Sequence, residues 1–188
     1  ILIEFSSYEK NLDAVDKINE IVNLGLKKKI ISNAVFANSK KQSKQIWNLR
    51  ENISEAQKKN GASIKNDISV PIFAVDEFIR KADLIVSKEI PKAKKITFGH
   101  LGDGNIHYNI SQPENLSQDS FFKLEKPLRE KLLSLIVKME GSFSAEHGIG
   151  IVRKKDALKI KGDEIKIMKS IKKSLDPKNI LNPGKIFD

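Results

Sequence analysis

The sequence has 188 residues, of which 39% are hydrophobic and 31% charged, a balance that is typical of a globular chain and excludes wholesale disorder. The absence of cysteine excludes disulfide frameworks, Cys-ligated zinc, iron–sulfur clusters and thiol catalysis, and no run of about 18 apolar residues is present that could span a membrane. Only four of the 34 basic residues are arginine, so we interpret the net charge of +10 mainly as a solvated lysine surface.

The chain opens on the segment Ile1-Leu2-Ile3-Glu4-Phe5, a short apolar run without an initiator Met or a signal-peptide pattern. We therefore predict a buried strand over residues 1–6 and expect the chain to be a piece of a longer polypeptide. Apolar residues at helical spacing predict a helix over residues 9–26, and a short strand is expected at residues 33–37.

The rest of the chain mixes helices and strands without a strict βαβ order. We predict helices over residues 39–59, 76–89, 119–139 and from 163 onward, a strand over 64–70, and a hairpin over 94–110. Residues 144–150 read as a shaped loop and residues 181–185 as turns. This order predicts an α+β fold, a mainly antiparallel sheet with helices on one face, in a single domain of residues 1–188.

Histidine is the most informative residue type, because all three histidines of the chain, His100, His107 and His147, lie in glycine-rich turns. If Asp103-Gly104 forms a two-residue type I′ turn, His100 pairs with His107 and their Cβ atoms lie about 5 Å apart on one face, with Asn109 beside them. Both imidazoles could then bind one metal ion. A three-residue loop would move one histidine to the other face, and the turn taken alone is more often a plain tight turn.

Two imidazoles need at least one further ligand, and Glu146 is the natural candidate. His147, directly after it, could supply acid–base chemistry, although the pair taken alone is more often a polar loop. Two histidines and a carboxylate with open positions suit a catalytic zinc or a similar divalent metal. The glycines do not form a dinucleotide-binding or phosphate-binding motif, because Gly-x-Gly-x-x-Gly is missing and the Gly102–Gly104 turn joins two strands.

Four segments of the chain resemble one known family. Gly99–His107 and Gly141–Gly150 are similar to the two signature stretches of the FAD-linked oxidase C-terminal domain, Leu175–Lys185 resembles its closing motif, and Ile46–Ala56 is also similar. The motifs stand in the family's order and cover essentially the whole chain. This ferredoxin-like domain is the substrate and cap domain of flavin-dependent D-2-hydroxyacid dehydrogenases, which include the D-lactate, glycolate and D-2-hydroxyglutarate enzymes.

The resemblance implies roles for residues in several parts of the chain. It implies that the metal ligands are His100, His107 and Glu146, that the base for the substrate hydroxyl is His147, that the substrate is bound by Arg50, Ser54, Lys65 and Asn109, and that the residue approaching the flavin is Asn182. Without the resemblance, Arg50 reads as a charge on a helix surface and Lys65 as one of many solvated lysines.

The resemblance also implies a reaction and its cofactors. A D-2-hydroxy acid, D-2-hydroxyglutarate ahead of D-lactate or glycolate, would be oxidised to the 2-oxo acid with hydride transfer to FAD and the help of a divalent metal, expected to be zinc. FAD would be held mainly by an upstream FAD-binding domain that is absent here, so the chain alone is expected neither to hold FAD tightly nor to turn over. The electron acceptor is unidentified.

Further expectations concern partners and location. We expect the cytoplasm or the inner face of a membrane as the location, no nucleic-acid partner, and leave a homodimer open. Two alternatives from other classes remain at this point. One is a basic nucleic-acid-binding module, which the charge suggests but the lack of arginine clusters opposes. The other is a metal-binding domain that has lost catalysis.

Overall fold

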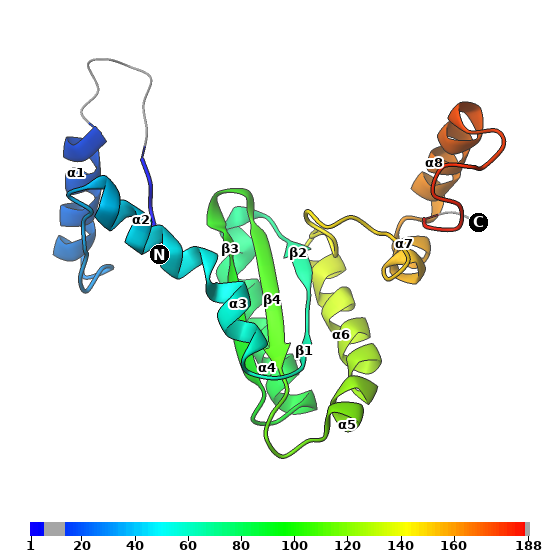
Figure 1. Ribbon diagram of the computed structural model, residues 1–188, viewed down its shortest axis with the longest axis horizontal. Helices are drawn as coiled ribbons and strands as arrows, with labels where there is room; N and C mark the ends of the chain where they lie inside the picture. The colour runs from blue at the N-terminus through cyan, green and yellow to red at the C-terminus, as the bar shows by residue number, and fades with distance from the viewer. Residues whose placement is uncertain (6–13, 187–188) are drawn as a thin grey trace. The chain divides into compact units, whose positions relative to one another are not determined.

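The computed structural model of the chain describes residues 1–5 and 14–186, and the chain divides into two compact units, Ile1–Ala56 and Gln57–Asp188 (Figure 1). The first unit holds α1 (Ala14–Lys27), α2 (Lys40–Glu51) and the start of α3 (Ile53–Lys58). The predicted helix over 9–26 is present as α1, and its residues 9–13 lie outside the described residues. Ser39 caps α2, because its hydroxyl accepts the Gln42 N–H at 3.2 Å.

Other predictions for the first unit were wrong. Residues 1–5 and 33–37 form no strand, while residue 6 of the first predicted strand lies outside the described residues. In residues 33–37, Val35 is 81% exposed, as expected for an apolar residue that is not part of a sheet. The predicted helix over 39–59 is interrupted at Asn52, whose side-chain amide donates to the Asn48 carbonyl at 2.8 Å and ends α2.

The second unit is built on a small antiparallel sheet. Its strands are β1 (Ser63–Ile64), β2 (Asp67–Ser69), β3 (Lys94–His100) and β4 (Asn105–Ser111). β4 is central: β3 pairs with it on one side, and β1 and β2 follow one another in a single register on the other. Between them, the Asn66 carbonyl accepts the Tyr108 N–H at 2.9 Å. The predicted strand over 64–70 is therefore one interrupted strand, and the predicted antiparallel α+β class is confirmed.

The helices of the second unit differ from the prediction in two places. They are the 3₁₀ turn η1 (Ile72–Ala74), α4 (Val75–Glu89), α5 (Gln118–Lys123), α6 (Glu125–Lys138), α7 (Lys154–Ile160) and α8 (Gly162–Leu175). The predicted helix over 119–139 is divided into α5 and α6, because Pro127 has no N–H and is tolerated only in a first helical turn. α7 was not predicted. Every helix in the described ranges is too short or too polar to cross a bilayer.

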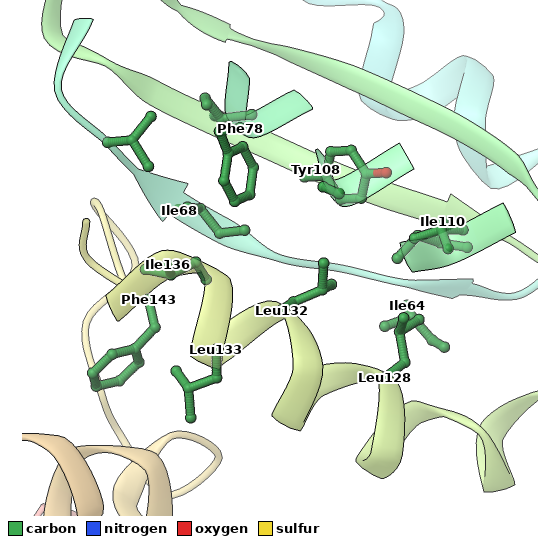
Figure 2. Packing of buried hydrophobic residues seen from close by; sticks show 14 of the residues in the cluster. Ile64, Ile68, Phe78, Tyr108, Ile110, Leu128, Leu132, Leu133, Ile136 and Phe143 are labelled. Atoms are coloured by element: carbon green, nitrogen blue, oxygen red, sulfur yellow. The ribbon is translucent and has the colours of Figure 1, made fainter. Parts of the chain in front are cut away.

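The core lies on one face of β4, as the period of two requires. Ile106, Tyr108 and Ile110 are at most 3% exposed and pack with residues at helical spacing on the two covering helices. Those helical residues are Phe78, Ala82 and Val86 of α4 and Leu128, Leu132 and Ile136 of α6. Figure 2 shows the α6 residues on the side of that helix that faces the strands. The helices α4 and α6 therefore cover one face of the sheet, whereas Asn109 on the other face contacts Gln57 of α3.

Candidate metal centre

The second face of β4 is polar, although it is nearly as buried as the core face. Asn105, Asn109 and Ser111 are 7%, 5% and 1% exposed, and the His107 side chain is 12% exposed. Alternation along the strand brings these four residues to one face. Burying polar groups costs free energy unless they find partners, so this face is where a function of the chain is to be sought.

The loop of the β3–β4 hairpin is longer than the predicted two-residue turn. A type I′ turn needs positive φ at two residues, but only Gly104, with φ of 72°, has it here. Leu101–Asp103 instead form a 3₁₀ turn, η2, and the Asp103 carboxylate accepts the Asn105 N–H at 3.0 Å. Gly104 is required for a second reason, because a Cβ at this position would lie 2.0 Å from the Val70 carbonyl oxygen.

The longer loop changes the pairing of the histidines. His100 lies opposite Asn105, and Phe98 lies opposite His107, so the predicted pairing of His100 with His107 was wrong by two residues. A shift of two keeps both histidines on one face but makes them diagonal neighbours, which are about 7–8 Å apart, with their Cβ atoms somewhat closer. The ring of Phe98 takes the place next to His107, with ring centroids 5.0 Å apart.

The loop that follows α6 is fastened to β2 by its backbone. Ser69 and Ser142 exchange two N–H···O bonds of 2.9 and 2.8 Å, which form an isolated antiparallel bridge. Gly141 makes this approach possible, because a Cβ there would lie 2.4 Å from the Ser69 carbonyl oxygen. The bridge brings Glu146 and His147, far away in the sequence, to the polar face of the sheet.

Four side chains converge at this place: Asp67 from β2, His107 from β4, and Glu146 and His147 from the loop. One potential ligand atom of each lies within 4.8 Å of those of the others. His107 Nε2 lies 3.0 Å from Glu146 Oε1, and His147 Nε2 lies 3.6 Å from the same oxygen. The two imidazole rings stack with centroids 5.5 Å apart and an interplanar angle of 18°.

The four side chains differ in their exposure to solvent: two are buried and two are open. The side chains of Asp67 and His107 are 9% and 12% exposed, whereas those of Glu146 and His147 are 45% and 66% exposed. A small molecule can therefore reach the loop residues while the strand residues hold the base of the site. The Asn105 side-chain amide supports the open end by donating to Glu146 Oε2 at 3.0 Å.

Asp67 is the member of the group that sequence reasoning missed. Its Oδ2 accepts the backbone N–H groups of Glu146 and His147 at 3.0 and 2.9 Å, and its Oδ1 lies 3.8 Å from His107 Nδ1. The signal was present, because Asp67 is an acidic residue in the middle of the predicted strand over residues 64–70. Buried acidic residues are rare without a partner, so this position alone could have been flagged.

The structure does not bring His100 into the group. Its residue is exposed at the end of β3, and the set of converging ligand atoms does not include it. Its assignment as a metal ligand stays a prediction. Asn109 is on the same buried face, and its side-chain amide donates to Gln57 Oε1 at 2.8 Å.

The other predicted site residues lie away from the converging side chains in the sequence. Arg50 is in α2 and Ser54 is in α3, both in the first unit, and Lys65 is exposed between β1 and β2. Asn182 is exposed in the C-terminal tail, with a left-handed φ of 47°. Their assigned roles are untested by these positions and stay predictions.

Unsatisfied polar atoms gather on the polar face. Among the described residues, five buried side-chain polar atoms have no hydrogen-bond partner: Gln57 Nε2, Asp67 Oδ1, Asn105 Oδ1, Ser111 Oγ and Arg129 Nε. The first four belong to residues on the polar face of β4 or in contact with it. An orphaned buried group costs about 1–3 kcal/mol unless water or a ligand satisfies it, so the cost of burying polar groups is concentrated on this face.

The donor set fits a divalent metal. Imidazole and carboxylate are the ligands that catalytic zinc and similar ions take when they keep open positions for a substrate. His107 Nε2 and Glu146 Oε1 already face each other, and the orphaned Asp67 Oδ1 lies on the other side of the same imidazole. The residues present therefore suit a cation on the Glu146 side of His107.

Comparison with known proteins matches the sequence to one family. The family described as FAD linked oxidases, C-terminal domain, matches residues 1–186. A D-2-hydroxyglutarate dehydrogenase of Stutzerimonas stutzeri is 39% identical over 84% of this chain and 34% of its own length. The mitochondrial D-2-hydroxyglutarate dehydrogenase of Arabidopsis thaliana is 37% identical over 100% of this chain and 32% of its own length.

A third relative has a related activity in its name. The D-2-hydroxyglutarate–pyruvate transhydrogenase of Saccharomyces cerevisiae is 34% identical over 98% of this chain and 38% of its own length. The chain thus spans about a third of the length of these relatives, and the resemblance drawn from its motifs is confirmed.

Proposed function

The chain belongs to the family of FAD-linked oxidase C-terminal domains, and we propose that it is the substrate- and metal-binding part of a dehydrogenase that oxidises a D-2-hydroxy acid to a 2-oxo acid. The observation that carries the proposal is the meeting of His107, Glu146 and His147 at the polar face of β4, in a chain of this family. We propose an FAD-binding domain as the partner of this chain, since no dinucleotide-binding motif is legible in the sequence.

The ligands for the metal in this proposal are His107 and Glu146, whose facing atoms are 3.0 Å apart, together with His100. His100 is a diagonal neighbour of His107 on the same face, so its side chain must turn towards His107 to take part. When bound, a divalent ion polarises the 2-hydroxyl group of the substrate and lowers its pKa, and FAD accepts the hydride.

His147 is the residue we assign as the base. Its side chain is 66% exposed, so it can reach a substrate that enters from solvent, and it is held next to Asp67 and Glu146 at 3.6 Å. A neutral imidazole accepts a proton readily near neutral pH. In this mechanism His147 takes the proton of the 2-hydroxyl group, and the electrons of the adjacent C–H bond leave as hydride.

The substrate carboxylates are assigned to cationic and polar side chains. Arg50 can bind a carboxylate through two parallel hydrogen bonds, Lys65 adds a point charge, and Ser54 adds a hydroxyl group. Two cationic residues favour a dicarboxylate, so we propose D-2-hydroxyglutarate, with D-lactate or glycolate as the alternative. Asn109 of β4 is also assigned to the substrate, and Asn182 is assigned to the flavin.

The test is an activity assay on the complete enzyme that carries this chain. Reduction of an artificial electron acceptor should depend on a D-2-hydroxy acid and be abolished by a chelator, then restored by zinc or another divalent ion. His100→Ala and His107→Ala should lose metal and most turnover while the protein remains folded. Full activity in a metal-free preparation would contradict the metal role.

A second arm of the test addresses the substrate. Arg50→Ala should raise KM for D-2-hydroxyglutarate about 10-fold or more, because a charge-assisted, forked contact of about 1.5–3 kcal/mol is lost. Arg80→Ala is a matched control, because Arg80 is an exposed helix residue paired with Asp76 at 3.0 Å. An unchanged KM in Arg50→Ala would remove Arg50 from the site.

A further inference from the structure

We propose that Asp67 is a positioning residue, whose single carboxylate seats the Glu146–His147 loop on the sheet and orients the imidazole of His107. The part of this inference that concerns the metal rests on the proposed function, whereas the seating of the loop does not. Asp67 is not among the residues that the motifs of the sequence identify.

The first observation is the contact with the loop backbone. Two consecutive N–H groups, those of Glu146 and His147, donate to Asp67 Oδ2 at 3.0 and 2.9 Å. These residues are 79 and 80 positions away from Asp67 along the chain. Hydrogen bonds from backbone N–H groups to an ionised carboxylate are among the stronger ones in proteins. The carboxylate therefore positions the backbone of Glu146 and His147, from which both side chains extend.

The second observation is the free oxygen of the same carboxylate. Asp67 Oδ1 is buried and has no hydrogen-bond partner among the described residues, and it lies 3.8 Å from His107 Nδ1. On the opposite side of the ring, His107 Nε2 faces Glu146 at 3.0 Å. A metal-binding histidine commonly donates its second N–H to a carboxylate, which fixes the tautomer and the ring orientation. Asp67 is placed to give His107 this support once the ring moves slightly closer.

These contacts favour a positioning role over direct ligation. Oδ2 is already used by two backbone N–H groups, and Oδ1 is on the Nδ1 side of His107, away from the Glu146 oxygen that faces Nε2. A ligand would need to share the Nε2 side of the ring. Asp67 instead connects the three residues that the proposed chemistry uses. It contacts the backbone N–H groups of Glu146 and His147, and it lies beside the imidazole ring of His107.

The chain contains a matched control for this carboxylate. Asp176 is 6% exposed and also accepts two consecutive backbone N–H groups, from Ile180 to Oδ1 at 3.0 Å and from Leu181 to Oδ2 at 2.9 Å. Both of its oxygens are used, and Lys172 also donates to it. Asp176 therefore holds a local turn, and its removal should disturb that turn without affecting the metal.

The test compares Asp67→Ala, Asp67→Asn and Asp176→Ala in the complete enzyme. Hydrogen–deuterium exchange of residues 142–148 should rise in Asp67→Ala and stay close to the unaltered protein in Asp67→Asn, whose side-chain oxygen still accepts N–H groups. In Asp176→Ala the increase should be confined to residues near 176–181. Unchanged exchange in Asp67→Ala, or equal increases in the Ala and Asn variants, would overturn the seating role whether or not a metal binds.

The second readout uses Co²⁺ as the probe. Asp67→Ala should weaken Co²⁺ binding about 10- to 100-fold, the usual effect of losing the carboxylate that supports a metal-binding histidine, and Asp67→Asn should weaken it less. The visible absorption bands of bound Co²⁺ should keep their positions in Asp67→Asn, because the ligands are unchanged. Shifted bands would make Asp67 a ligand and overturn the positioning role, whereas failure of the unaltered protein to bind Co²⁺ would refute the proposed metal centre instead.

Discussion

The two faces of β4 are made by alternate residues of one strand, yet they are built in opposite ways. Ile106, Tyr108 and Ile110 pack against apolar side chains of the covering helices. On the opposite face, His107 contacts Glu146 and Asn109 contacts Gln57, and four orphaned polar atoms gather on this side. Burial of apolar side chains on the core face stabilises the fold, whereas burial of unpaired polar groups on the other face destabilises it. Proteins usually retain such destabilising groups at functional sites.

The largest expected effect on stability is on the core face. Ile110→Ala removes a fully buried side chain and should lower the free energy of unfolding by about 2–5 kcal/mol, because it leaves a cavity between the sheet and its helices. Urea denaturation would measure this. A loss smaller than that caused by Asn109→Ala would break the comparison between the two faces.

Tyr108 combines both properties, because its ring is in the core and its hydroxyl donates to Asp83 at 2.6 Å. Tyr108→Phe should cost about 1.5 kcal/mol at neutral pH, the lower end for a hydrogen bond to a charged group, since Asp83 is partly exposed to water. Phe keeps the ring, so the core packing should survive and only the polar contact should be lost.

The same substitution should depend on pH. Burial, and next the contact with Asp83, raises the pKa of Tyr108 above its ordinary value. A raised folded-state pKa stabilises the fold below the unfolded pKa, and this stabilisation is lost as the pH rises above about 10. The difference in stability between the unaltered protein and Tyr108→Phe should therefore shrink above that pH. A constant difference from pH 7 to 11 would show that the hydroxyl group is not held neutral by its surroundings.

A smaller effect is expected on the polar face. Asn109→Ala removes the 2.8 Å hydrogen bond to Gln57 and should lower stability by about 1 kcal/mol. A double-mutant cycle with Gln57→Ala would isolate the energy of the pair. In the complete enzyme the same substitution should raise KM, and an unaltered KM would separate Asn109 from the substrate pocket.

The smallest effect is expected at Ser111, which ends the polar face. Its hydroxyl is buried without a hydrogen-bond partner in the described part of the chain, so Ser111→Ala should change stability by less than about 0.5 kcal/mol or increase it. Ser117→Ala is the control, because the Ser117 hydroxyl caps α5 and its loss should cost about 1 kcal/mol. If Ser111→Ala lowers stability as much as Ser117→Ala does, the Ser111 hydroxyl group has a hydrogen-bond partner, for example a bound water molecule.

Much of the site was accessible from the sequence, for a reason that the histidines illustrate. The chain contains only three imidazoles, and the Glu146-His147 pair follows a glycine that ends a helix, so the residue types and their order pointed to three of the four residues that converge. Two of the three histidines, His107 and His147, do meet in the structure. Each of these histidines lies next to a glycine-rich turn in the sequence, and such short-range patterns can be recognised without a structure.

The pairing of His100 shows where local patterns stop. Asp103-Gly104 has the composition of a type I′ turn, but the loop is set by contacts beyond the turn itself. The Val70 carbonyl is too close to Gly104 for any Cβ, and β2 pairs with β4 on the side away from β3. Turn chemistry allows both loops, and the loop that forms is the one whose Gly104 carbonyl accepts the Val70 N–H at 3.2 Å, a contact that lies outside the hairpin.

By itself, the sequence determined the fold class, the two faces of the central strand and the residue types of the site. Composition and the alternation of side chains along a strand depend only on residues that are close together in the sequence. Only the tertiary structure decided the hairpin register and the place of Asp67. The Asp67 carboxylate acquires its partners from a loop 79 residues away, and no local pattern encodes a contact of that range.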